Sequence, residues 1–270
     1  MKTTDPAPSA RIAAPVAGWN PIDWPGSAAV RAAHTTREGG TSEGPWGNAR
    51  GVAGLNLGAR CGDDPARVVA NRALLGCMLP GEPIWLDQVH GTAVHVAAGL
   101  GSGEPRADAA VTRLPGVVLA ILTADCLPVL FADRDGEVVG AAHAGWRGLA
   151  AGVLENAVAA AIGLAPHASG WTAWLGPAIG QSAYEVGDDV REGFVASDAG
   201  AASCFAPGRR AGKWQCDLAA LARRRLARAG VECLPGPAWC THDEPRRFYS
   251  FRRDATTGRM GSFIWIDADR

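Results

Sequence analysis

The chain has 270 residues, of which 47% are hydrophobic, so it can bury a large core and lies at the upper end of the single-domain range. Its formal net charge is −1, which gives no overall field to attract nucleic acid or an anionic membrane. No segment has the continuous apolar length of a membrane span or the apolar core of a secretion signal. We therefore expect a small-molecule partner, with no nucleic-acid and no membrane partner.

Seven cysteines are scattered through the chain without a C-x-x-C pair. An odd number of unpaired cysteines in a large chain favours free thiols in a reducing compartment over a disulfide framework. We therefore expect a cytoplasmic protein. Residues 1–20 are rich in proline and alanine and lack periodicity, which predicts a flexible tail before one domain spanning residues 21–270.

The first expected elements are a strand at 32–37 and a loop at 38–45, where glycines and polar residues gather. Asp64 and Pro65 then have the residue types of a helix N-cap and first turn, and apolar residues recur at helical spacing as far as Leu75. Short apolar runs typical of buried strands follow. They lie at 84–86, 93–96, 109–111, 117–122, 127–131 and 138–142.

The sequence of the second half of the chain predicts more helices than that of the first half. Apolar residues recur at helical spacing from 146 to 164, and further helices are expected at 188–195 and 218–229 before a final strand at 262–266. Because the strands cluster instead of alternating strictly with helices, we expect an α+β fold of mixed β-sheets flanked by helices in a single large domain. The glycine-rich fingerprints for dinucleotides and for ATP phosphates are missing from the sequence, which disfavours both cofactors.

Three segments each place one soft metal ligand beside small residues at the end of an apolar run. They are Gln88-Val89-His90-Gly91, Thr123-Ala124-Asp125-Cys126 and Ala142-His143-Ala144-Gly145. Loops from one edge of a sheet converge, so we expect these ligands to meet. Two imidazoles and a thiolate suit zinc, and an ion held by three protein groups keeps a fourth position for water or substrate. His90, Cys126 and His143 are therefore the predicted metal ligands and catalytic residues.

Two interpretations from other classes stay open. A cysteine beside a histidine is also the nucleophile and base of a cysteine hydrolase, so Cys126 could act with His143 or His90 and without a metal. A non-catalytic structural or partner-binding protein is the second, although it leaves the polar residues at the strand ends without a role.

Two arginines have patterns that suit a bound anion. Arg147 is expected in the first turn of the helix after His143, where free backbone N–H groups favour negative charge. Arg252 lies among aromatic residues in Phe248-Tyr249-Ser250-Phe251-Arg252-Arg253, which suggests partial burial beside a bound partner.

Eight segments resemble motifs of the laccase-domain family, and together they span nearly the whole body of the chain. They are residues 34–40, 54–58, 62–65, 87–91, 123–129, 143–148, 176–180 and 248–253. Members of this family have been called multicopper polyphenol oxidases and, later, purine nucleoside phosphorylases with accompanying adenosine deaminase activity, and some bacterial members are linked to peptidoglycan editing. The resemblance implies that His90, Cys126 and His143 bind zinc, with copper as the alternative ion. One departure is Arg60, where relatives commonly carry histidine.

The resemblance implies a zinc-dependent purine nucleoside phosphorylase acting on adenosine, inosine or methylthioadenosine, with adenosine deaminase activity. Polyphenol oxidation and an amidase that edits a peptidoglycan precursor are its alternatives, but a laccase needs His-x-His pairs and none of the six histidines forms one. Phosphorolysis needs a bound phosphate, for which Arg37, Arg147 and Arg252 are the candidates. Asn56 is the candidate for hydrogen bonds to sugar or base.

Overall fold

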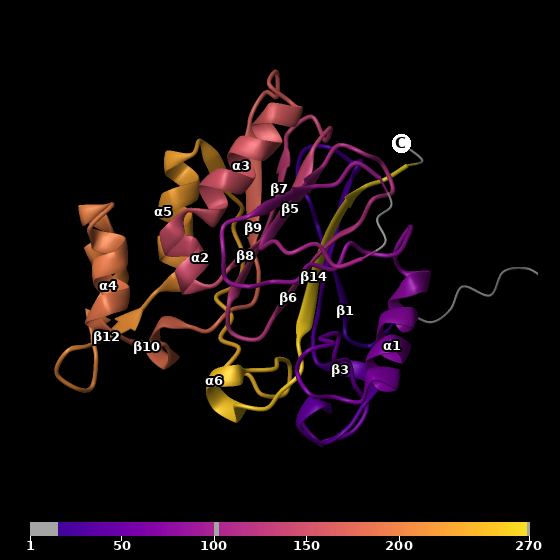
Figure 1. Ribbon diagram of the computed structural model, residues 1–270, viewed down its shortest axis with the longest axis horizontal. Coiled ribbons are helices and arrows are strands. Elements are labelled where there is room, and N and C mark those ends of the chain that lie inside the picture. The colour runs from indigo at the N-terminus through magenta and orange to yellow at the C-terminus, as the bar shows by residue number, and fades with distance from the viewer. Residues whose placement is uncertain (1–15, 100–102, 269–270) are drawn as a thin grey trace, which may run out of the picture.

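Two β-sheets packed face to face form the centre of the computed structural model, which describes residues 16–99 and 103–268 (Figure 1). The four-stranded sheet is antiparallel and has the order β1-β2-β14-β6. Its strands are β1 (Trp19–Ile22), β2 (Val30–Thr35), β14 (Met260–Ile266) and β6 (Leu119–Thr123).

The six-stranded sheet has the order β13-β9-β7-β8-β5-β4, and it is mixed because its two outer strands pair parallel to their neighbours. The four inner strands are antiparallel. The strands are β13 (Val231–Cys233), β9 (Trp171–Leu175), β7 (Leu127–Asp133), β8 (Val139–Ala144), β5 (Ala109–Thr112) and β4 (Val94–Val96).

Helices cover the outer face of the six-stranded sheet, and a small three-stranded sheet lies beyond them at one end of the molecule (Figure 1). The six-stranded sheet is covered by α2 (Trp146–Ala151), α3 (Val153–Leu164) and α5 (Leu218–Arg228). The small sheet contains β10 (Glu185–Gly187), β12 (Lys213–Cys216) and β11 (Phe205–Pro207), with α4 (Asp188–Val195) beside it. On the side of the molecule opposite the small sheet, α1 (Pro65–Leu74) packs near β3 (Glu38–Ser42). The short helix α6 (Phe251–Asp254) precedes β14. Short 3₁₀ helices are η1 (Gly44–Trp46), η2 (Leu75–Cys77), η3 (Gln181–Ala183) and η4 (Ala199–Cys204).

The side chains of the central strands are buried on both faces of the six-stranded sheet. In β7, Leu130 and Ala132 pack between the two sheets, whereas Val129 and Phe131 pack toward α3 and α5. Successive side chains of a strand point to opposite faces, so a strand buried on both sides needs a continuous apolar run. The expected α+β fold of mixed sheets flanked by helices is therefore confirmed.

Three predicted elements differ from the structure. The helix expected over 146–164 is two helices, because Gly152 between them has a left-handed φ of +101°. The loop expected at 38–45 is wrong over 38–42, which form β3; Gly40 allows that strand to approach Gly54, whose carbonyl oxygen would lie 2.2 Å from an added Cβ. The strand expected at 84–86 is reduced to one bridge between Ile84 and Leu119.

The predicted tail at 1–20 also extends too far along the chain. Trp19 and Asn20 lie within the predicted range 1–20 but belong to β1, where Trp19 pairs with Thr35 and packs against the ring of Phe263. Residues 1–15 lie outside the described residues.

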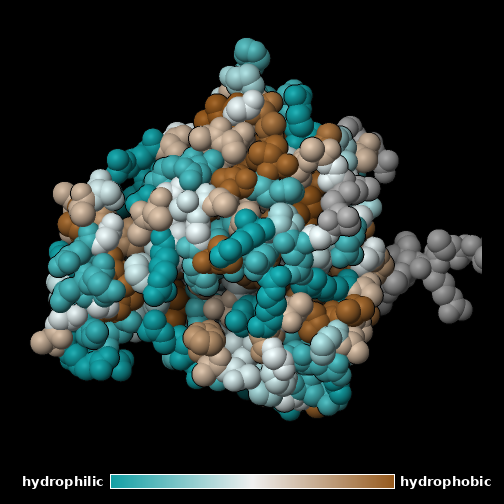
Figure 2. Space-filling view, in the orientation of Figure 1, coloured by the Kyte–Doolittle hydropathy of each residue, from teal (hydrophilic) through white to brown (hydrophobic). Residues whose placement is uncertain are grey.

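The surface seen in Figure 2 mixes hydrophilic residues with smaller hydrophobic patches. Within residues 16–99 and 103–268, no helix combines the length and apolarity needed to cross a bilayer.

Candidate metal centre

The three predicted ligands come together at one edge of the six-stranded sheet. Cys126 directly precedes β7 and His143 lies near the end of β8, and these strands are antiparallel neighbours with Pro128 opposite His143. The ligand atoms of His90, Cys126 and His143 all lie within 4.8 Å of one another. Sγ of Cys126 is 3.8 Å from Nε2 of His90, near the separation of about 3.6 Å that tetrahedral zinc imposes on a sulfur and a nitrogen ligand. The geometry therefore suits a single ion.

Asp108, in the loop before β5, orients His143 and the turn at His90, and no motif in the sequence pointed to it. Its buried carboxylate accepts a hydrogen bond from Nδ1 of His143 at 2.8 Å. The same carboxylate accepts the backbone N–H groups of Val89, His90 and Gly91 at 3.1, 2.9 and 2.6 Å. Donation from Nδ1 leaves the lone pair on Nε2 of His143 available to a metal. One carboxylate thus orients one ligand and fixes the turn that carries another.

A second aspartate fixes the turn before Cys126. Asp125 has a left-handed φ of +87°, which is uncommon for a residue with a side chain. Its carboxylate accepts the Thr241 hydroxyl and the backbone N–H of Arg252, both at 2.6 Å. These contacts compensate the unfavourable backbone conformation and tie the Cys126 turn to the segment that leads to α6.

Gly145 is required where it stands because a Cβ there would lie 2.8 Å from Cδ2 of His90 and 3.1 Å from Sγ of Cys126. The sequence interpretation that small residues near His143 permit a close approach agrees with this packing.

Cys126 and His143 stabilise each other's charged forms. Burial alone would raise the pKa of the Cys126 thiol, but His143 and His90 lower it to about 6. Burial alone would lower the pKa of His143, but the Cys126 thiolate and the Asp108 carboxylate raise it to about 9. Before a metal binds, the pair is a thiolate and an imidazolium at neutral pH. A thiolate is both the form that binds zinc and the form that acts as a nucleophile.

A cavity of about 390 Å³ opens onto the three ligands, which form part of its wall. Its lining combines apolar side chains with three arginines. The other main contributors are Arg60, Arg72, Leu86, Gln88, Glu104, Leu122, Ala124, Phe251 and Arg259. Gln88 is held in place because its side-chain amide pairs with both the N–H and the carbonyl of Leu122 at 2.8 Å.

Arg37 and Asn56 do not line this cavity; both are committed to internal hydrogen bonds. Nε and Nη2 of buried Arg37 donate to the Gly47 carbonyl and Nη1 donates to the Pro245 carbonyl, while its guanidinium lies 4.7 Å from the centre of the Tyr249 ring. Asn56 is fully buried, and its side-chain oxygen accepts the N–H groups of Gly58 and Arg259. Asn56 thereby supports two residues of the cavity lining, Gly58 and Arg259.

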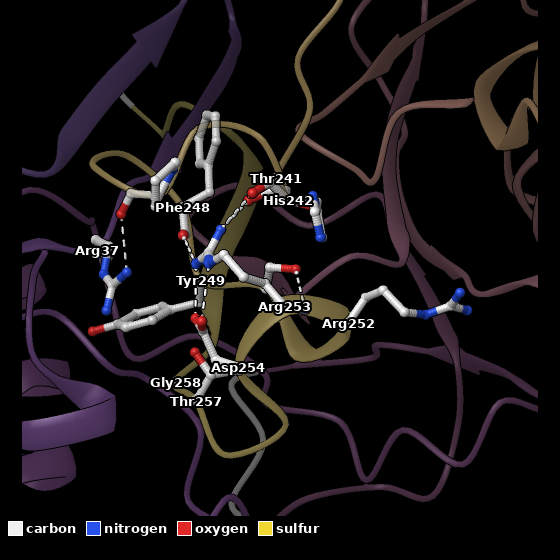
Figure 3. A network of polar contacts seen from close by, with 12 residues as sticks. Arg37, Thr241, His242, Phe248, Tyr249, Arg252, Arg253, Asp254, Thr257 and Gly258 are labelled. Carbon is white, nitrogen blue, oxygen red and sulfur yellow. Dashed lines mark hydrogen bonds and ion pairs between the residues drawn. The ribbon is translucent and has the colours of Figure 1, made fainter. Parts of the chain in front are cut away.

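Arg147 and Arg252 also lie outside the cavity lining. Arg147 is in the first turn of α2, as expected, but its guanidinium turns onto the ring of Trp146 at 4.5 Å. Arg252 points away from the network around Arg253 in Figure 3, and its Nη1 donates to the Glu185 carbonyl at 2.9 Å. The sequence predicted the first helical turn for Arg147 but not the direction of its side chain. The partial burial expected for Arg252 is wrong, because its side chain reaches over the surface to Glu185 and is exposed.

Arg253 organises the segment between Thr241 and α6, as Figure 3 shows. Its guanidinium donates to the carbonyls of Thr241, His242 and Phe248 at 2.7, 2.9 and 3.0 Å, and it pairs with Asp254 at 2.8 Å. This network fixes the segment that leads into α6.

A family model described as multi-copper polyphenol oxidoreductase laccase matches residues 31–267. The chain belongs to this laccase family. Among the similar family members, purine nucleoside phosphorylase YfiH of Escherichia coli is 49% identical over 90% of this chain and 96% of its own length. A purine nucleoside phosphorylase of Pseudomonas aeruginosa is 48% identical over 92% of this chain and 98% of its own.

Solved structures of two similar chains have the same fold. A crystal structure of a Neisseria meningitidis protein matches with a TM-score of 0.84 at 45% identity, covering 93% of this chain and 100% of that one. YlmD from Geobacillus stearothermophilus matches with a TM-score of 0.78 at 31% identity, covering 93% and 96% of the two chains.

Proposed function

We propose that this protein is a zinc-dependent purine nucleoside phosphorylase acting on adenosine, inosine or methylthioadenosine, with adenosine deaminase activity in the same cavity. The observation that carries the proposal is the convergence of His90, Cys126 and His143 on an open cavity, in a chain nearly half identical to relatives named purine nucleoside phosphorylase. A cavity of about 390 Å³ is within the range of small-molecule sites. The free thiols of all seven cysteines support a cytoplasmic location.

The donor set supports zinc over multicopper chemistry. Two histidines and a cysteine also occur in blue-copper sites, but a laccase adds a cluster of further copper ions with histidine ligands of their own. In the part of the chain that the structure describes, His90, Cys126 and His143 are the one group of three or more potential ligands close enough to hold an ion. A single three-ligand site with room for substrate fits catalytic zinc.

Several residues in and beside the cavity have a part in the proposed reaction. Zinc, when bound, would supply a Lewis acid beside the substrate. His90, Cys126 and His143 hold it, and Asp108 keeps His143 in the tautomer that can bind. Leu86, Leu122 and Phe251 give apolar surface for a purine, and an arginine of the lining holds phosphate. A phosphate oxygen forms a bond to the anomeric carbon as the glycosidic bond to the purine nitrogen breaks.

The proposal is tested by assaying inosine and adenosine with protein loaded with one zinc per chain and with the same protein after chelation. We expect phosphate-dependent release of hypoxanthine and phosphate-independent deamination of adenosine, both lost on chelation and restored by zinc. Loaded protein that acts on neither nucleoside would contradict the proposal.

The cysteine hydrolase is the second candidate, because His143 and His90 lower the pKa of Cys126 to about 6. Alkylation by iodoacetamide distinguishes the zinc enzyme from the cysteine hydrolase. A zinc ligand is alkylated only after chelation, whereas a free nucleophile is alkylated at once and its hydrolytic activity survives chelation.

A further inference from the structure

We propose that Arg259 forms the anion subsite of the metal cavity and binds inorganic phosphate there. The inference rests on the proposed phosphorolysis and assigns its second substrate to one residue. Arg259 lies directly before β14, in a stretch that the sequence did not mark as a site.

Three arginines line the cavity, and two of them already have acidic partners. Arg60 forms ion pairs with Asp87 and with Glu104, the latter at 2.8 Å. Arg72 pairs with Glu104 at 3.4 Å, donates to the Leu57 carbonyl at 3.0 Å and lies 4.0 Å above the ring of Trp85. An anion at either arginine would compete with a carboxylate that is already in place.

Arg259 differs because its charge is not compensated. Nη1 donates to the carbonyls of Thr257 and Gly258, both at 3.0 Å, and these neutral partners leave the positive charge in place. Within residues 16–99 and 103–268 the structure shows no acidic partner for Arg259 and no acceptor for its Nε or Nη2. Two parallel N–H donors on a planar cation match two oxygens of a phosphate.

The position of Arg259 is fixed by a second segment of the chain. Its backbone N–H donates to the Asn56 side chain at 2.8 Å, and its carbonyl accepts the N–H of Leu57 at 3.1 Å. Its side chain crosses Gly58 so closely that a Cβ there would lie 2.6 Å from Cγ of Arg259. A side chain held in this way loses less conformational entropy on binding a ligand than a free surface arginine does. Asn56 and Gly58 are thus positioning residues for Arg259.

The subsite and the metal ligands belong to one cavity. Phosphate at Arg259 and a nucleoside beside His90, Cys126 and His143 would therefore share one space, whose lining also includes Leu122 and Ala124. Phosphorolysis requires this proximity, because the phosphate oxygen must reach the anomeric carbon as the glycosidic bond breaks.

The test compares Arg259→Met with Arg259→Lys in zinc-loaded protein, with Arg113→Met as the matched control at an exposed arginine outside the cavity lining. Calorimetry gives the Kd of inorganic phosphate, and steady-state kinetics give KM for phosphate and for inosine. We expect Arg259→Met to raise Kd and KM for phosphate by roughly 10- to 100-fold, the usual loss for a charged hydrogen-bonding group. The KM of inosine should change by less than about threefold.

Arg259→Lys keeps the charge but loses the two parallel N–H donors of the guanidinium. Its Kd and KM for phosphate should therefore lie between those of wild type and Arg259→Met. Both values for Arg113→Met should match wild type. Zinc content and melting temperature show whether each variant is folded. If Arg259→Met does not fold, the phosphate Kd of Arg259→Lys decides, and a value equal to that of wild type overturns the inference.

The outcomes separate this inference from the proposed function. Wild-type phosphate affinity in Arg259→Met, or a wild-type protein that binds no phosphate, overturns the subsite. A wild-type protein that binds phosphate through Arg259 but leaves inosine intact overturns the phosphorylase proposal and keeps the anion subsite.

Discussion

The carboxylate of Asp108 accepts a hydrogen bond of 2.8 Å from Nδ1 of His143, and both side chains are almost completely buried. The same carboxylate holds three consecutive backbone N–H groups around His90. One buried charge therefore orients His143 and the turn at His90, which lie on separate segments of the chain.

Asp108→Asn should weaken zinc binding by about 10- to 100-fold, as losing a carboxylate that orients a histidine ligand generally does. An asparagine keeps one acceptor oxygen, but its NH₂ group faces donors that the carboxylate now satisfies. Competition with a fluorescent chelator measures the zinc Kd. Melting temperature of the chelated proteins is the control, and an unchanged zinc Kd in a folded variant would remove Asp108 from its positioning role.

The ligand set is tested by His90→Ala, Cys126→Ser and His143→Ala. Each should reduce bound zinc from one ion per chain to a small fraction, because two protein ligands rarely hold zinc tightly and a hydroxyl replaces a thiolate poorly. Cys77→Ser is the matched control, since Cys77 is exposed and lies outside the cavity lining. Elemental analysis decides, and a variant that keeps stoichiometric zinc excludes its residue from the set.

Zinc binding should release about one proton per ion at pH 7.5. Cys126, with a pKa of about 6, is already a thiolate at this pH, whereas His143, with a pKa of about 9, is still protonated and must lose its proton to bind. Zinc affinity should therefore rise with pH between about 6 and 9 and fall more steeply below pH 6, where the thiolate is also protonated. Calorimetry in buffers of different ionisation enthalpy measures the proton count, and zero proton release at pH 7.5 contradicts this charge state.

Two glycine substitutions should separate site packing from chain stability. Gly145→Ala places a Cβ against His90 and Cys126, so it should lower zinc affinity. Gly152→Ala forces a side chain into a left-handed conformation between α2 and α3 and should cost about 1–2 kcal/mol of unfolding free energy without changing zinc affinity. Chemical denaturation measures the unfolding free energy of both variants, and chelator competition measures their zinc affinity. Unchanged zinc affinity in Gly145→Ala, or weakened zinc affinity in Gly152→Ala, would contradict the roles given to these two glycines.

The convergence of Cys126 and His143 was predictable because each lies at the end of an apolar run, and β7 and β8 pair. His90 follows residues 84–86, which form only one bridge, so its approach to the other two depends on the turn that Asp108 holds. Asp108 was not predictable, because its partners at 89–91 and at His143 become neighbours only when β5 and β8 pair. Arg147 was placed correctly in a first helical turn, but local pattern does not specify that its side chain turns onto Trp146. Arg259 reaches the cavity because β14 lies between β2 and β6, a pairing that depends on residues far apart in the sequence.

Glycine-rich composition misled the prediction in one place and was uninformative in another. Gly39 and Gly40 suggested a loop, yet Gly40 serves a close approach of β3 to Gly54. Gly152 lies within an otherwise continuous helical pattern, and only its left-handed conformation shows that one helix ends there.

Phosphorus NMR of the product shows directly whether the proposed zinc site performs phosphorolysis. Zinc-loaded protein incubated with inosine and inorganic phosphate should convert the phosphate signal into that of ribose 1-phosphate, with an equal amount of hypoxanthine. The conversion should disappear in Cys126→Ser. Stoichiometric zinc together with an unchanged phosphate signal, or hypoxanthine release at the same rate without phosphate, would contradict phosphorolysis at this site.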